Sequence, residues 1–165
     1  MSALSAILAA RELLCELTPL KTDCGRLCGG ACCEGDEETG MLLFPGEDAL
    51  YETCSFARVI PADFALGGEQ VKLFVCAGRC ERENRPLACR LFPLMAYTRK
   101  DGTLGVRTDA RGRAVCPLCH GPASALSRDF REKALAVYAL LMQDPEQAAF
   151  LKELMALEAQ FRFTL

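Results

Sequence analysis

Apolar residues recur at helical spacing at both ends of the chain. Residues 2–17 carry leucine and isoleucine at this spacing after serines that can cap a helix, which predicts an N-terminal helix. Two further amphipathic stretches, 130–141 and 150–161, are separated by Asp144–Pro145, a pair that suits the cap and first position of a helix. The sequence therefore predicts a C-terminal helical hairpin over 127–162.

Short apolar runs broken by turn residues occupy the middle of the chain. They predict strands at 41–44, 54–60, 71–76, 91–99 and 103–109. Pro61 and Gly67–Gly68 punctuate this region, and a turn at 100–102 joins the last two strands into a hairpin. We therefore expect an α+β fold: an N-terminal helix, a cysteine-rich irregular metal-bound centre with a small antiparallel sheet, and the C-terminal helical hairpin.

Length and composition predict one domain over residues 1–165 and exclude several classes of protein. Hydrophobic residues make up 51% and charged residues 25%, which is not the composition of a disordered chain. The formal net charge of −3 argues against a general nucleic-acid binder. No apolar run approaches the roughly 18 residues of a membrane span, and the first residues lack the basic region of a signal peptide. We expect a cytoplasmic protein that does not bind a membrane.

Cysteine is the residue that points to chemistry, because the chain has eleven cysteines, one histidine and no tryptophan. An odd number of cysteines in a chain of this length favours metal ligation or thiol redox chemistry over a disulfide scaffold. Cys15 and Cys54 stand apart from the others, and Cys15 falls on the apolar face of the predicted N-terminal helix, where we expect a small buried thiol. The candidate metal ligands fall within 24–120 and are Cys24, Cys28, Cys32, Cys33, Cys76, Cys80, Cys89, Cys116 and Cys119.

Spacing nominates these ligands but leaves their grouping open. A four-cysteine zinc site usually combines two close pairs, and Cys76/Cys80 with Cys116/Cys119 could supply one such set. Cys24, Cys28, one residue of the Cys32–Cys33 pair, and Cys89 could supply another. Successive side chains of an extended chain point to opposite faces, so Cys32 and Cys33 either address different metals or leave one spare thiol.

Several other motifs are absent or weak. The spacing at 24–32 is C-x3-C-x3-C and differs from that of radical-SAM enzymes, and a single histidine excludes an HExxH metalloprotease. We expect His120 to be a surface residue. The arginines that surround the later cysteines are expected to offset thiolate charge, and they are Arg79, Arg82, Arg85 and Arg90. Most of the seven acidic residues in 34–52 are expected to form a solvated face.

Two segments together resemble the YkgJ-type cysteine-cluster family, a zinc- or iron-chelating domain known by its CxxCxxCC motif. They are CGRLCGGACC at 24–33 and RPLACRLFP at 85–93, and Glu47 holds the place of an acidic residue found after the cluster in that family. The first cluster departs from the motif, since three residues instead of two precede the paired cysteines. The ligands that the resemblance implies are Cys24, Cys28, Cys32, Cys33, Cys80 and Cys89, with a looser match at Cys76 and Cys116.

These observations predict an intracellular protein that chelates zinc or iron through thiolates, either as single ions or in an iron–sulfur cluster. Two alternatives stay open. One is a redox or protein-modifying enzyme that uses a cluster or reactive thiols. An open coordination position on the metal would favour it, and so would an exposed thiol of low pKa, for which Cys33 is the first candidate. The other is a protein-interaction module whose fold is held together by zinc. Metal ions are the only partner that the sequence indicates.

Overall fold

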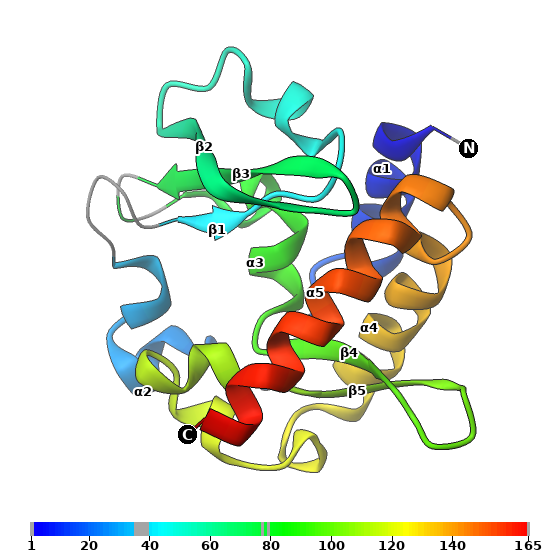
Figure 1. Ribbon diagram of the computed structural model, residues 1–165. Coiled ribbons are helices and arrows are strands. Elements are labelled where there is room, and N and C mark those ends of the chain that lie inside the picture. Colours follow the sequence, from blue (N-terminus) through cyan, green and yellow to red (C-terminus); the bar gives the residue numbers. More distant parts are fainter. Residues whose placement is uncertain (1, 35–39, 77, 79, 165) are drawn as a thin grey trace.

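The computed structural model describes residues 2–34, 40–76, 78 and 80–164, and it is a mixture of helices and small antiparallel sheets (Figure 1). The helices are α1 (Ala3–Leu14), α2 (Gly25–Cys28), α3 (Leu87–Leu91), α4 (Arg128–Leu141) and α5 (Pro145–Thr164). The strands are β1 (Met41–Leu42), β2 (Ala57–Leu66), β3 (Glu69–Cys76), β4 (Leu94–Thr98) and β5 (Leu104–Thr108). The predicted α+β class is confirmed, with its N-terminal helix, antiparallel sheets and C-terminal helices.

Helix starts follow the capping residues expected from the sequence. The Ser2 hydroxyl accepts a hydrogen bond from the Ser5 amide at 3.2 Å, and Asp144 Oδ1 accepts one from the Gln147 amide at 3.1 Å. Helix α1 is shorter than expected and ends at Leu14, so Cys15 is its C-terminal cap with a φ of 52°. Cys15 is consequently exposed, and its expected place on the apolar face of the helix is wrong.

The three-stranded sheet has the order β1-β3-β2 and is antiparallel throughout. Strand β2 continues through Pro61, which was expected to interrupt it. Proline is tolerated there because β2 is an edge strand and its register shifts between Pro61 and Ala65. Gly67 in the β2–β3 turn has a φ of +64°, and a Cβ at this position would lie 2.7 Å from the Phe150 amide nitrogen. The turn therefore needs glycine to pack against α5.

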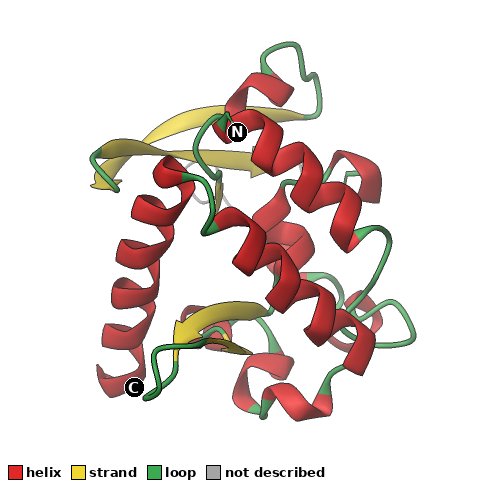
Figure 2. Ribbon diagram, turned by 90° about the vertical axis from the view of Figure 1, so that its right-hand side faces the viewer, coloured by secondary structure: helices red, strands yellow, loops and turns green. Residues whose placement is uncertain are grey.

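The two C-terminal helices follow one another as expected, and both contact β4. Helix α4 also lies against α1 and β5, whereas α5 also contacts β2 and the 3-10 turn η4 (Ala110–Ala114). Figure 2 shows α4 and α5 diverging from the loop that joins them. One hydrophobic cluster nevertheless draws side chains from α1, α3, α4, α5 and the strands, so these elements share a core. No helix among the described residues has both the length and the apolarity to cross a membrane.

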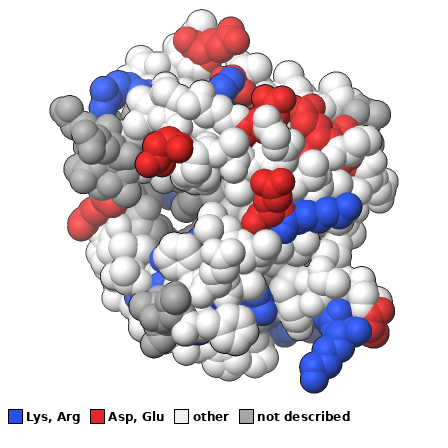
Figure 3. Space-filling view, in the orientation of Figure 1, with Lys and Arg blue, Asp and Glu red and all other residues white. Residues whose placement is uncertain are grey.

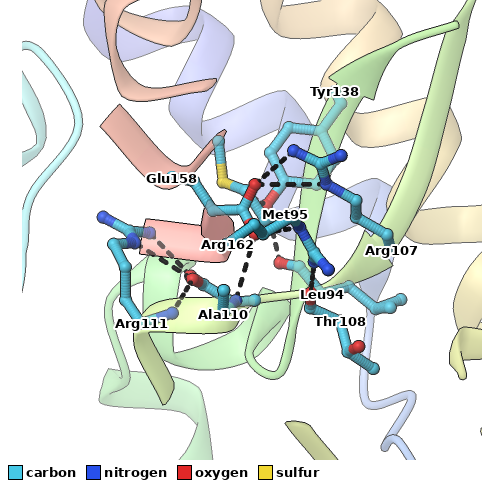
Figure 4. A network of polar contacts seen from close by, with 10 residues as sticks. Leu94, Met95, Arg107, Thr108, Ala110, Arg111, Tyr138, Glu158 and Arg162 are labelled. Carbon is cyan, nitrogen blue, oxygen red and sulfur yellow. Dashed lines mark hydrogen bonds and ion pairs between the residues drawn. The ribbon is translucent and has the colours of Figure 1, made fainter. Parts of the chain in front are cut away.

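A buried carboxylate fastens α5 to the segment after β5 (Figure 4). Glu158 is fully buried, and its oxygens accept hydrogen bonds from the Ala110 amide at 3.0 Å and from Arg107 Nε at 3.1 Å. Arg162, one helical turn later, completes the ion pair at 2.8 Å. The network fixes the start of η4, and the chain then runs directly into the Cys116–Cys119 segment through η5 (Pro117–His120).

Candidate metal centre

Five cysteines line one cavity of about 140 Å³ beneath the end of the three-stranded sheet, and they are Cys32, Cys33, Cys76, Cys80 and Cys89. They come from the turn η1 (Ala31–Cys33), from the end of β3, from the segment that follows it, and from α3. The remaining walls include Met41, Phe74 and Phe92, which are apolar, and the guanidinium of Arg85. The cavity therefore combines soft sulfur donors, one cation and an apolar lining.

The thiols in this cavity act on one another electrostatically. Burial raises the pKa of Cys89, and the neighbouring Cys80 and Cys33 raise it further. Burial and Cys76 raise the pKa of Cys80 to about 11, while the nearby Arg85 opposes this rise. Burial alone would lower the pKa of Arg85, but the charges of Cys33, Cys80 and Cys89 outweigh it and raise that pKa. The thiols and the arginine thus form one interacting group.

Among the described arginines of the predicted set, Arg85 is the one that interacts with the cavity thiols. Arg82 instead binds the Leu17 carbonyl and the Glu16 carboxylate, and Arg90 Nη2 donates to the Glu83 carbonyl at 3.0 Å. These two arginines hold the segment that precedes Cys89 against the N-terminal part of the chain. Arg79 lies outside the described residues.

Four other cysteines gather in a second group, where α2 lies beside the turns at 110–120 (Figure 1). They are Cys24, Cys28, Cys116 and Cys119. Burial raises the pKa of Cys24, and the neighbouring Asp23, Cys116 and Cys28 raise it further. The fold places Cys76 and Cys80 with Cys89 at the cavity, and so favours another grouping than the suggested one of Cys76/Cys80 with Cys116/Cys119. The sequence could not show this, since it does not record which loops meet.

The Cys32–Cys33 pair lies between the two groups. The pKa of Cys32 is raised by a hydrogen bond with Cys33 and by burial, and also by the charges of Cys28 and Cys24. Cys33 acts on Cys89 and Arg85 in the cavity. Cys32 thus interacts with thiols of both groups, and the two alternatives that the adjacency raised, different metals or one spare thiol, both stay predictions. Cys32 is exposed at the cavity rim.

The donor set suits zinc or iron, although the thiols are not yet arranged around an ion. Within the described residues, no three histidine, cysteine or acidic side chains are close enough to hold a metal ion. Thiolates are ligands for both metals, and the raised pKa values of Cys24, Cys32, Cys80, Cys89 and Cys119 mean that metal binding must release protons. His120 is exposed, as expected, with its Nε2 2.9 Å from the Arg113 carbonyl oxygen.

Glu47 is a buried carboxylate that supports the site, in a stretch whose acidic residues were mostly expected to be solvated. Its Oε1 accepts a hydrogen bond from the Leu87 amide at 2.7 Å, at the start of α3, and its Oε2 accepts one from the Phe44 amide at 3.2 Å. Burial raises the pKa of Glu47 to about 7, although these two amides and Arg11 oppose the rise. Because α3 carries Cys89, Glu47 positions one wall of the cavity. Three acidic residues of the same stretch, Asp36, Glu37 and Glu38, lie outside the described residues.

We expect Glu47→Ala to lower the free energy of unfolding by about 2–3 kcal/mol, because the buried Phe44 and Leu87 amides lose their acceptor. Glu47→Gln keeps one acceptor oxygen and should cost less. Urea denaturation of metal-free protein measures both, with the exposed Glu52→Ala as the matched control. An unfolding free energy for Glu47→Ala within about 0.5 kcal/mol of that of Glu52→Ala would contradict this role.

Charge on the visible surface does not indicate a nucleic-acid interface. On the face shown in Figure 3, the described basic side chains stand singly or in small groups between acidic and uncharged ones. Comparison of the chain with protein-family models, with curated proteins and with solved structures gave no match. The resemblance to the cysteine-cluster family stays a prediction.

Proposed function

We propose that the protein binds zinc or iron through thiolates, with a centre at the cavity lined by Cys33, Cys76, Cys80 and Cys89. The observation that carries this proposal is the convergence of five thiols from four segments on one cavity, with Cys32 exposed at its rim and the other four less exposed. All eleven cysteines are free, as a metal-binding chain in a reducing compartment requires, and we place the protein in the cytoplasm on that ground.

The chain supplies more than sulfur to such a centre. Four thiolates around a divalent ion leave a net negative charge, and the Arg85 guanidinium is placed to offset it. The apolar walls at Phe74 and Phe92 keep water from part of the cavity, which strengthens electrostatic interactions inside it. The zinc- or iron-chelating role implied by the family resemblance agrees with this chemistry.

A second candidate function is a redox or protein-modifying enzyme that works at the same cavity. The observation that favours it is the size of the cavity, since about 140 Å³ gives room for several water molecules beside the thiols. A metal with an open coordination position there could take a small molecule as an additional ligand. The reactive-thiol form of this hypothesis gains less support at Cys24, Cys32, Cys80, Cys89 and Cys119, because the pKa of each is raised, whereas a nucleophilic thiol needs a lowered one.

The test is the metal content and visible absorption spectrum of protein purified without oxygen. We expect metal at stoichiometric or greater amounts per chain. A colourless zinc protein would support the chelating function, and a brown protein with iron and acid-labile sulfide would favour the redox enzyme. Protein that purifies without metal, and that binds neither zinc nor iron on anaerobic reconstitution, would refute both forms of the proposal.

A further inference from the structure

We propose that Cys24, Cys28, Cys116 and Cys119 form a second metal site, a closed zinc site separate from the cavity. This inference rests on the proposed thiolate metal binding and assigns it a division into two sites of different character. None of these four cysteines lines the cavity, in contrast to Cys32, Cys33, Cys76, Cys80 and Cys89.

Each half of the second site is a pair of cysteines in a single helical turn. Cys24 caps α2 and Cys28 ends it, which gives a C-x3-C spacing. Cys116 precedes η5 and Cys119 lies within it, which gives C-x2-C, and the Cys119 amide donates to the Cys116 carbonyl at 3.0 Å. Both spacings fall in the range used by structural zinc sites, where each close pair supplies two ligands of a tetrahedron.

The fold brings these two pairs together although about ninety residues separate them in the chain. The turns at 110–120 lie beside α2 (Figure 1), where the Cys116 thiol acts electrostatically on that of Cys24, and the thiols of Cys116 and Cys119 are hydrogen-bonded to each other. Cys116 is 7% exposed and Cys119 is 2% exposed, so this pair faces inward. A Cβ at Gly112 would lie 2.7 Å from Cys119 Sγ, so the Cys119 thiol packs directly against Gly112.

The two sites differ in what surrounds the thiols. The cavity has apolar walls, an arginine and space beside the sulfur atoms. The second group consists of two close pairs of cysteines, the usual ligand arrangement of a structural zinc site, in which four thiolates fill the four tetrahedral positions. An ion there would join the N-terminal loop to the segment after η4. Because it closes a long loop, the ion would stabilise the fold, as a structural zinc does.

Zinc per chain in cysteine variants tests the division, with native mass spectrometry of anaerobically zinc-loaded protein as the measurement. We expect two zinc ions in the unsubstituted protein, one in Cys116→Ser, one in Cys89→Ser and none in the double variant. Cys15→Ser is the matched control and should keep both ions, because Cys15 is an exposed thiol that belongs to neither group.

The outcomes separate this inference from the proposed function. A protein with a single zinc that Cys89→Ser removes and Cys116→Ser does not would support metal binding at the cavity and overturn the second site. Loss of both ions in a folded Cys116→Ser variant would show one shared centre and also overturn the division. No zinc in the unsubstituted protein would refute the proposed function itself.

A measurement on the unsubstituted protein keeps the inference testable if Cys116→Ser does not fold. The alkylation rate of each cysteine is compared between zinc-loaded and metal-free protein by peptide mapping. Zinc should slow the alkylation of Cys24 and Cys28 at least tenfold, together with that of Cys116 and Cys119. Alkylation of Cys24 and Cys28 at the same rate with and without zinc would overturn the second site.

Discussion

Cys89→Ser should remove the metal from the cavity and lower the thermal stability of the zinc-loaded protein. A serine hydroxyl is a poor replacement for thiolate toward zinc or iron, and Cys89 lies on α3 between Cys80 and Cys33. Binding of an ion to the folded state alone contributes about 4 kcal/mol when free metal is 1,000-fold above its Kd. For a domain of this size, loss of that contribution lowers Tm by roughly 10 °C.

Cys15→Ser is the matched control for this substitution. Cys15 is exposed at the end of α1, so the exchange of sulfur for oxygen there should leave both metal content and Tm as in the unsubstituted protein. Differential scanning calorimetry and metal analysis on the same preparations measure the two properties. A Cys89→Ser protein with full metal content and an unchanged Tm would show that the cavity thiols are not ligands.

Local signals in the sequence predicted the elements well. Ser2 and Asp144 cap helices as expected, because a capping residue acts on amides two or three positions away and needs no tertiary contact. The β4–β5 hairpin also forms around its expected turn. The expected break of the strand at Pro61 was wrong, because tolerance of a proline depends on tertiary structure. A strand accepts proline when it lies at an edge of the sheet, as β2 does.

The grouping of the cysteines in the candidate site could not be predicted from the local sequence. Composition and spacing were enough to nominate nine cysteines, but not to group them. Cys76 and Cys80 lie with Cys89 because α3 packs against β1, which pairs with β3. Cys116 lies with Cys24 because the turns after β5 reach α2. These are contacts between segments distant in the chain. The spacing of close pairs is the same for either grouping.

The hydrophobic pattern of the sequence also did not indicate which acidic side chains are buried. The apolar stripe expected on α5 was Phe150, Leu154, Leu157 and Phe161, yet Phe161 is 42% exposed and Glu158 is fully buried. Glu158 occupies a position on the inward face that an apolar residue would normally fill. It can do so because Arg107 and Arg162 neutralise its charge, and Arg107 comes from a strand about fifty residues earlier. A hydrophobic pattern cannot reveal a partner at that distance.

The same carboxylate links the C-terminal helix to the proposed second metal site. Glu158 accepts from the Ala110 amide, and the Cys116 amide in turn donates to the Gly112 carbonyl at 2.8 Å. The turn that carries Cys116 is therefore held at its start by α5. Preorganisation of this kind reduces the conformational entropy that the Cys116–Cys119 pair loses when it binds an ion.

Glu158→Ala should lower the free energy of unfolding by about 3 kcal/mol, because it leaves two arginines and a buried amide without their carboxylate. We place the loss at the low end of the range for broken buried ion pairs, since both arginine side chains keep some contact with water. Glu132→Ala is the matched control on the preceding helix. It breaks an exposed ion pair with Arg128 and should leave the free energy of unfolding nearly unchanged. Urea denaturation of metal-free protein separates the two, and equal losses would mean that the Glu158 network does not hold α5 to the turn at Ala110.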